Sequence, residues 1–151
     1  MEDGEIRMMR ALSLWQPWAS AMYLGLKANE TRSWPTSYRG DLAICAAKRK
    51  MTFLERELYV AFVAPATKNT PHLLPYGCVL CVVELYDCMA SESFLFSNIT
   101  PGERALGNYS AGRWVWCTHN LRPLKQAIPI VGRQGLWKLT PEEETAVRAQ
   151  L

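Results

Sequence analysis

Short apolar runs separated by turn residues recur along the chain and predict a domain built mainly of strands. The run at 42–47 is almost wholly apolar, which indicates a strand buried on both faces. The run at 77–89 is the longest, and it is β-branched and apolar apart from Glu84 and Asp87. Further strands are predicted at 11–14, within 25–34, and at 113–118, 127–131 and 135–139.

Helix signals are fewer and lie between these runs. Pro17 is expected at the first position of a short helix that Gly25 ends. A second helix is predicted over 52–64, after a basic run. Residues 91–112 are rich in Ser, Asn and Gly and are expected to form a loop.

The end of the chain carries a clearer helix signal. Thr140, Pro141 and Glu143 form a capping box with proline at the first helical position, which predicts a short C-terminal helix. Strands still outnumber helices. The pattern therefore predicts an α+β fold, a small mixed β-barrel with two or three flanking helices.

Three charged residues lie close together just after the first predicted helix. Lys27, Glu30 and Arg32 are spaced at i, i+3 and i+5. In a strand, Glu30 and Arg32 point to the same face while Lys27 comes from the preceding turn, so the three groups can converge at the mouth of the strand. An exposed edge strand whose charges discourage aggregation shows the same pattern.

Tryptophans near these charges favour a site. Trp34 follows the charged residues, and Trp15 and Trp18 precede them. Aromatic side chains beside charged groups offer stacking surfaces for a planar ligand.

The composition fits one globular domain. Of the 151 residues, 49% are hydrophobic and 21% are charged, which is enough for one core. We expect the domain to span 10–140, with an extension at 1–9 and a helical tail at 141–151. The sequence has no apolar run of eighteen residues and begins with acidic residues, so we expect no membrane span, no secretory signal and a cytoplasmic protein.

The net charge of +3 permits an anionic partner without requiring one. Lys48, Arg49 and Lys50 form the densest basic run, which is either a solvated helix entrance or a phosphate clamp beside a site. Five cysteines in apolar surroundings fit reduced, buried thiols. Cys78 and Cys81 form a lone C-x-x-C inside an apolar strand, so we expect no metal site and no cofactor.

Glu84 interrupts the longest apolar run. A carboxylate at such a position must reach solvent, a cation or a hydrogen-bond donor, because burying it alone costs several kcal/mol. It is therefore either an outward-facing surface residue or part of a site.

Four blocks of residues stand in order along the chain. They are Leu12-Ser13-Leu14-Trp15-Gln16-Pro17-Trp18-Ala19; Gly25-x-Lys27-x-x-Glu30-x-Arg32-x-Trp34; Tyr38-Arg39-Gly40-x-Leu42-x-Ile44 with Ala46-Ala47-Lys48-Arg49; and Pro129-Ile130-x-Gly132-x-Gln134-Gly135-Leu136-Trp137. Together they resemble the ASCH domain, a relative of the PUA domain, from about Arg10 to Leu139. The resemblance implies a PUA-like β-barrel with a cleft that suits RNA or a nucleoside.

A small bacterial branch of that superfamily hydrolyses the amide of N4-acetylcytidine. It uses a lysine, a threonine three residues later and a glutamate from a later strand. By resemblance Lys27 matches the lysine, Glu84 the glutamate, and Arg32 an arginine at the same spacing. Glu30 occupies the threonine position, where it would orient water or Lys27.

Two hypotheses of different classes follow. In the first, the protein is an amidohydrolase for N4-acylated cytidine or cytosine, with Lys27, Glu84 and Glu30 catalytic. The low net charge favours this hypothesis over a protein that depends on phosphate contacts. In the second, it is a non-catalytic module that binds RNA or a modified base. The residues expected to contact the ligand are Arg32, Trp15, Trp18, Trp34 and Lys48.

Overall fold

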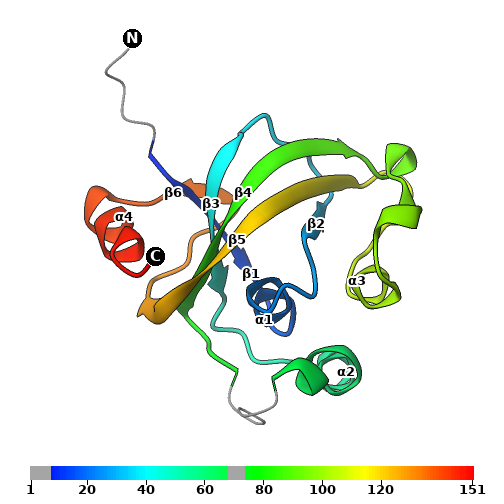
Figure 1. The fold of residues 1–151 in the computed structure, drawn as a ribbon, viewed down its shortest axis with the longest axis horizontal. Coiled ribbons are helices and arrows are strands. Elements are labelled where there is room, and N and C mark those ends of the chain that lie inside the picture. The colour runs from blue at the N-terminus through cyan, green and yellow to red at the C-terminus, as the bar shows by residue number, and fades with distance from the viewer. Residues whose placement is uncertain (1–7, 68–73) are drawn as a thin grey trace.

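A six-stranded mixed sheet forms the centre of the computed structural model, which describes residues 8–67 and 74–151 (Figure 1). The strands are β1 (Arg10–Leu14), β2 (Asn29–Arg32), β3 (Gly40–Ala46), β4 (Cys78–Ala90), β5 (Trp114–Pro129) and β6 (Leu136–Lys138). Their order in the sheet is β2-β5-β4-β3-β1-β6. β1 and β3 are parallel, and the other neighbours are antiparallel.

Short helices surround this sheet. The α-helices are α1 (Trp18–Tyr23), α2 (Phe53–Leu58), α3 (Pro101–Ala105) and α4 (Pro141–Arg148). A π-helical turn, η1 (Tyr59–Val63), continues α2, and 3-10 turns form η2 (Ala64–Ala66), η3 (Ser91–Ser93) and η4 (Phe96–Asn98). Within the described ranges, no helix has the length and apolar character needed to cross a membrane.

The long strands β4 and β5 give the sheet its curl. They pair antiparallel, and three register shifts interrupt the pairing. Such irregularities bend a strand and increase its twist, so the sheet curves into a half-barrel. In Figure 1, α1 lies inside this curve and α4 lies on its outer side. The predicted mixed, barrel-like α+β fold is confirmed.

Both faces of the sheet are packed. Leu42 and Ile44 on β3 belong to the inner cluster, with Trp116 from β5. Ala43 and Cys45 point the other way, into an outer cluster that α4 covers. The prediction that the 42–47 run is buried on both faces is therefore confirmed.

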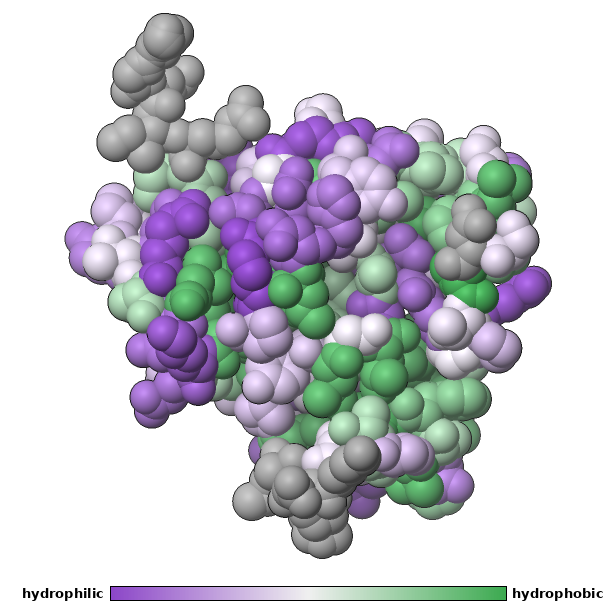
Figure 2. Space-filling view, in the orientation of Figure 1, coloured by the Kyte–Doolittle hydropathy of each residue, from purple (hydrophilic) through white to green (hydrophobic). Residues whose placement is uncertain are grey.

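Apolar side chains gather on the surface over α2 and η1, as Figure 2 shows. Phe53 and Leu54 are each 74% exposed. The segment is held from its other side, where Tyr59 and Val63 of η1 pack with Ala21 of α1. Burial of Tyr59 and Val63 stabilises the segment formed by α2 and η1, because an isolated helix of this length is marginal in water.

Two predicted strands are one. Most of the runs predicted at 113–118 and 127–131 belong to the 16-residue β5, which ends at Pro129. The long strand β4 also pairs with residues between the two runs, so they form one strand. The strand predicted at 135–139 is β6, Leu136–Lys138.

The first helix begins one residue later than predicted. Pro17 is its N-cap rather than its first residue, and the peptide bond from Gln16 to Pro17 is cis. Gly25 follows the helix with φ +75, a left-handed conformation that glycine adopts without steric cost. The expected glycine stop is confirmed.

The prediction of a loop at 91–112 is wrong in part. It contains η3, η4 and α3, and the Thr100 side chain caps α3 by accepting from the Glu103 N–H at 3.0 Å. The capping box of Thr140 and Glu143 at the start of α4 is confirmed.

Asp41 on β3 ties α4 and β5 to the outer face of the sheet. Arg122 donates to its Oδ1 at 2.8 Å, and Arg148 of α4 donates to its Oδ2 at 3.5 Å. The hydrogen bond from Arg122 is the largest cause of a lowered Asp41 pKa.

We expect Asp41→Asn to reduce the free energy of unfolding near neutral pH by up to about 1 kcal/mol. Because the folded-state pKa of Asp41 is lowered, the stabilisation is complete above the unfolded-state pKa and is lost as the pH falls through the folded-state value. Urea unfolding at pH values from about 6 down to about 2 should therefore show that the difference in the free energy of unfolding between variant and wild type becomes smaller. A difference that stays constant over this range would contradict the assignment.

Candidate functional site

A cleft of about 910 Å³ opens beside β2. The ends of β1 and β3 contribute to its lining, and the residues at 105–108 and 130–135 form further parts of its walls. The predicted site residues that line it are Trp15, Trp18, Lys27, Glu30, Arg32, Trp34 and Lys48.

Strand β2 positions the charged residues. Asn29 and Thr31 are buried, whereas Glu30 and Arg32 are partly exposed. β2 pairs with β5 in regular antiparallel register, with Glu30 opposite Trp116. Alternation along the strand therefore directs Glu30 and Arg32 to one face, as predicted.

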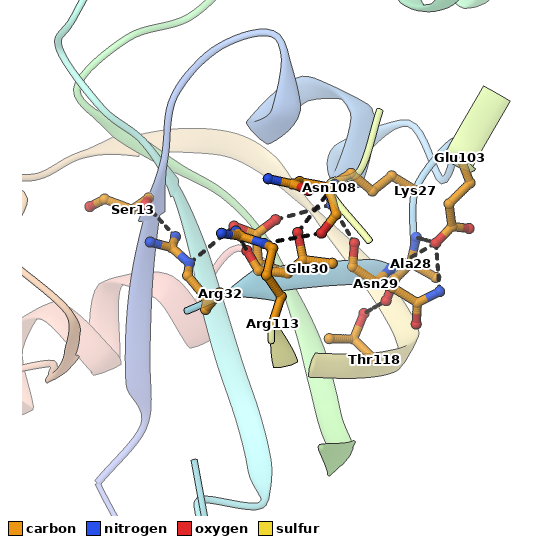
Figure 3. Close-up of polar contacts among 11 residues, drawn as sticks. Ser13, Lys27, Ala28, Asn29, Glu30, Arg32, Glu103, Asn108, Arg113 and Thr118 are labelled. Atoms are coloured by element: carbon orange, nitrogen blue, oxygen red, sulfur yellow. Dashed lines mark hydrogen bonds and ion pairs between the residues drawn. The ribbon is translucent and has the colours of Figure 1, made fainter. Parts of the chain in front are cut away.

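The Glu30 carboxylate lies between two cations (Figure 3). Its Oε1 is 3.0 Å from Lys27 Nζ, and its Oε2 is 3.1 Å from Arg32 Nε. The Lys27 side chain is only 1% exposed, and its ammonium also donates to the Asn29 carbonyl. A buried ammonium requires such partners, because an unpaired charge at this depth is strongly destabilising.

Arg32 joins two strands that are not neighbours in the sheet. Its guanidinium contacts Glu30 on β2 and donates from Nη2 to the Ser13 carbonyl on β1 at 3.1 Å. The contact links β2 to β1, and both Arg32 and Ser13 line the cleft. Two cations on one carboxylate leave a net positive charge, which favours anionic or carbonyl-bearing ligands.

Sequence reasoning missed Arg113 and Asn108, which also line the cleft. Arg113 Nη2 donates to the Thr31 carbonyl at 3.0 Å, and the Asn108 N–H donates to Thr31 Oγ1 at 3.3 Å. The segment before β5 is thereby fastened to β2. Only the pairing of β2 with β5 reveals this proximity, and the sequence alone does not specify that pairing.

Trp15 presents the most exposed aromatic surface of the cleft, at 53%. The Arg49 guanidinium lies over its ring, 3.6 Å from the centroid, and Arg49 Nη2 donates to Glu55 at 2.6 Å. Burial alone would raise the pKa of the Glu55 carboxyl, but hydrogen bonds from Arg49 and Thr52 outweigh burial and lower it. Arg49 is thus held in place as a support for the indole.

Trp18 and Trp34, the other tryptophans in the cleft lining, are partly packed into the core. Trp34 packs edge-on against Trp116 with ring centroids 4.8 Å apart, and Trp116 Nε1 donates to the Trp34 carbonyl at 3.1 Å. Trp18 packs against two of the hydrophobic clusters. They shape the cleft wall, while Trp15 is the freer stacking surface.

Lys48 reaches the cleft across Gly77. A Cβ at Gly77 would lie 3.2 Å from Lys48 Cγ, and the glycine has φ +67. A side chain there would be strained and would displace the lysine stem. Gly77 therefore maintains the path of Lys48 along the cleft.

Glu84 does not line the cleft. Val83 and Leu85 point into the inner cluster, so alternation places Glu84 on the outer face. Its side chain is 44% exposed, and its Oε1 lies 3.5 Å from His119 Nε2. The structure does not bring Glu84 to the cleft with Lys27, and the expected pairing of these two residues is absent from the described contacts.

Four of the five cysteines are buried, and Cys88 is partly exposed. All five are free, and burial raises the pKa of the Cys81 thiol to about 12, which makes it a poor nucleophile. Across 8–67 and 74–151, no three His, Cys, Asp or Glu side chains gather into a group that could hold a metal ion.

Comparisons with known proteins identify similar sequences and a similar fold. The family profile of the ASCH domain matches residues 12–125. Over 133 residues the chain is 34% identical to Activating signal cointegrator 1 of Homo sapiens and 33% identical to that of Mus musculus. Each alignment covers 85% of this chain and 22% of the relative, so the chain spans about a fifth of the length of these relatives.

Solved structures of an ASCH protein from Zymomonas mobilis share the fold. The unmodified protein superposes with a TM-score of 0.58 at 15% identity, covering 95% of this chain and 96% of the other. A point mutant of it gives 0.58 at 16% identity, covering 95% and 98%. At such identities the likeness concerns the fold alone.

The Glu30 ion pairs predict an order of stability. Glu30→Gln leaves Lys27 as a buried cation without an anionic partner, and should lower the free energy of unfolding by about 3 kcal/mol. Lys27→Met removes the buried charge while Glu30 keeps Arg32, and should cost less than about 1.5 kcal/mol. Urea unfolding at pH 7 measures both. The reverse order would show that Glu30 does not provide the balancing charge.

Proposed function

The chain belongs to the ASCH domain family, and we propose that its cleft binds a base of single-stranded RNA. This proposal rests on two features of the same cleft. One is the Glu30 carboxylate with the cations Lys27 and Arg32, and the other is Trp15, whose ring is supported by the Arg49 guanidinium. A stacking surface beside fixed hydrogen-bond donors is the arrangement that planar, polar bases need.

Stacking would supply the sequence-tolerant part of the affinity. One face of the Trp15 ring is covered by the Arg49 guanidinium, and more than half of the side chain is exposed. A base that stacks on such an indole gains about 1–3 kcal/mol. Because Glu55 already holds Arg49, little side-chain conformational freedom is lost on binding.

Arg32 would read the edge of the base. Lys27 is almost wholly buried, and its ammonium contacts Glu30 and the Asn29 carbonyl, so its role would be to hold Glu30 in place. The Arg32 guanidinium, on a side chain that is 26% exposed, suits acceptor-rich edges such as O2 and N3 of cytosine. Lys48, at the lining of the same cleft, would contact a phosphate.

A second candidate is hydrolysis of the acyl amide of N4-acylated cytidine, and the contact of a buried ammonium with a carboxylate inside the cleft favours it. In this reaction Glu30 accepts a proton from water, and the water oxygen adds to the amide carbonyl carbon. Lys27 donates to the developing oxyanion. The C–N bond then breaks, the proton passes to the leaving amine, and cytidine and a carboxylate are released.

Base binding ranks above hydrolysis for a geometric reason. Both oxygens of Glu30 are already bound to cations, which suits a carboxylate that orients donors better than one that accepts protons. Glu84, the second carboxylate expected for the chemistry, lies on the outer face of the sheet.

We expect Trp15→Ala to weaken binding of a cytidine-containing RNA hexamer about tenfold or more, because the stacking surface is lost. Tyr86→Ala is the matched control, since Tyr86 is 49% exposed and lies outside the cleft lining. Fluorescence anisotropy of labelled RNA gives both affinities. Equal affinity for Trp15→Ala and wild type would exclude Trp15 as the platform.

Salt provides the second arm of that experiment. Each phosphate contact contributes a factor of about 2.6 between 50 and 200 mM salt, so the contact at Lys48 alone should weaken hexamer binding about threefold. Free cytidine carries no phosphate, so its binding should stay nearly constant. A hexamer affinity that ignores salt would contradict phosphate contacts at Lys48.

The hydrolytic candidate is tested by incubating the protein with N4-acetylcytidine and detecting cytidine by ultraviolet absorbance. If the cleft performs this reaction, wild type releases cytidine, and Glu30→Gln and Lys27→Met each lose about a hundredfold or more of the rate. Absence of cytidine release by wild type would reject this candidate and leave base binding.

A further inference from the structure

Three helices start with the same local signal, a threonine N-cap followed three residues later by glutamate. The pairs are Thr52 and Glu55, Thr100 and Glu103, and Thr140 and Glu143. In α2 and α4 the glutamate bonds back to the threonine N–H, at 2.8 and 2.9 Å, and completes a capping box. In α3 the glutamate carboxylate turns to another element instead.

That element is the turn that carries Lys27. Glu103 Oε2 accepts from the Ala28 N–H at 3.0 Å, from the Asn29 N–H at 2.9 Å and from Asn29 Nδ2 at 2.7 Å (Figure 3). Glu103 is only 8% exposed. A buried carboxylate that gathers three donors from one turn is a strong, charge-assisted tether.

The same turn is held from its other side. The Ala28 carbonyl accepts from the Thr118 N–H at 3.0 Å and from Thr118 Oγ1 at 2.6 Å, and the Asn29 carbonyl accepts from Lys27 Nζ. The backbone between Lys27 and Glu30 therefore has partners for both its donors and its acceptors. Its conformation determines where the ammonium and the carboxylate lie.

We propose that Glu103 is a positioning residue for the cleft, which acts on the ligand through Lys27 and Glu30. Ala105, the last residue of α3, and the residues at 106–108 form part of the cleft wall, so the tether also fixes the width between this wall and β2. The divergence from the capping boxes of α2 and α4 supports this role, because α3 gives up a local hydrogen bond for a distant one. The binding consequence rests on the proposed function.

The first arm of the test needs no ligand. In Glu103→Gln the charge assistance is lost, and amide hydrogen exchange at Ala28 and Asn29 should accelerate about tenfold or more relative to wild type. Glu144→Gln is the matched control, because Glu144 in the first turn of α4 accepts the Met9 N–H at 2.9 Å away from the cleft. That control should leave exchange at Ala28 and Asn29 unchanged.

The second arm separates positioning from general stability. Glu103→Gln should weaken binding of the RNA hexamer about tenfold in the wild-type background and less than about twofold in the Lys27→Met background, because the two residues act through one route. Glu144→Gln should leave RNA affinity unchanged in both backgrounds. Equal losses in both backgrounds would reduce Glu103 to a structural residue and overturn the proposal.

The two arms distinguish a failure of the proposed function from a failure of the inference about Glu103. If wild type does not bind the RNA, the proposed function is wrong, and the exchange of Ala28 and Asn29 alone decides whether Glu103 holds the turn. Unchanged exchange in Glu103→Gln overturns the inference whatever the RNA result. Should Glu103→Gln fail to fold, Glu103→Asp keeps the charge but withdraws it from β2 by one methylene, and the same two comparisons apply.

Discussion

The Glu30 carboxylate, shared by Lys27 and Arg32, is the interaction on which the cleft depends. Lys27 is buried almost completely, so its charge is tolerated only beside an anion. Arg32 uses the other carboxylate oxygen and reaches the Ser13 carbonyl, which links β2 to a strand that is not its neighbour in the sheet. One carboxylate therefore balances a buried cation and contacts the guanidinium that links β2 to β1.

Much of this site follows from local rules. The two-residue period of a strand places Glu30 and Arg32 on one face, and the order of the motif blocks identifies the family. Gly25 ends the first helix as its φ requires. The start of α3 could also have been predicted, because Thr100, Pro101 and Glu103 repeat the spacing that identifies the C-terminal helix. The surrounding polar residues favoured a loop instead.

What could not be predicted depends on tertiary contacts. The segment around Glu84 is apolar on both sides, so alternation alone does not reveal which face meets the cleft, and the resemblance placed Glu84 with Lys27 although it lies on the outer face. Arg113 reaches Thr31 only because β5 pairs with β2. Glu103 bonds to Ala28 across 75 residues, a contact that its own helix signal does not indicate.

The most direct test of the cleft as a base-binding site is a titration with the RNA hexamer that is followed residue by residue by nuclear magnetic resonance. The account predicts that the Trp15 indole N–H and the side-chain nitrogens of Lys27 and Arg32 shift together and saturate with one dissociation constant. Signals of α4, on the outer side of the sheet, should stay in place. Shifts confined to the outer face, with the cleft signals unmoved, would contradict it.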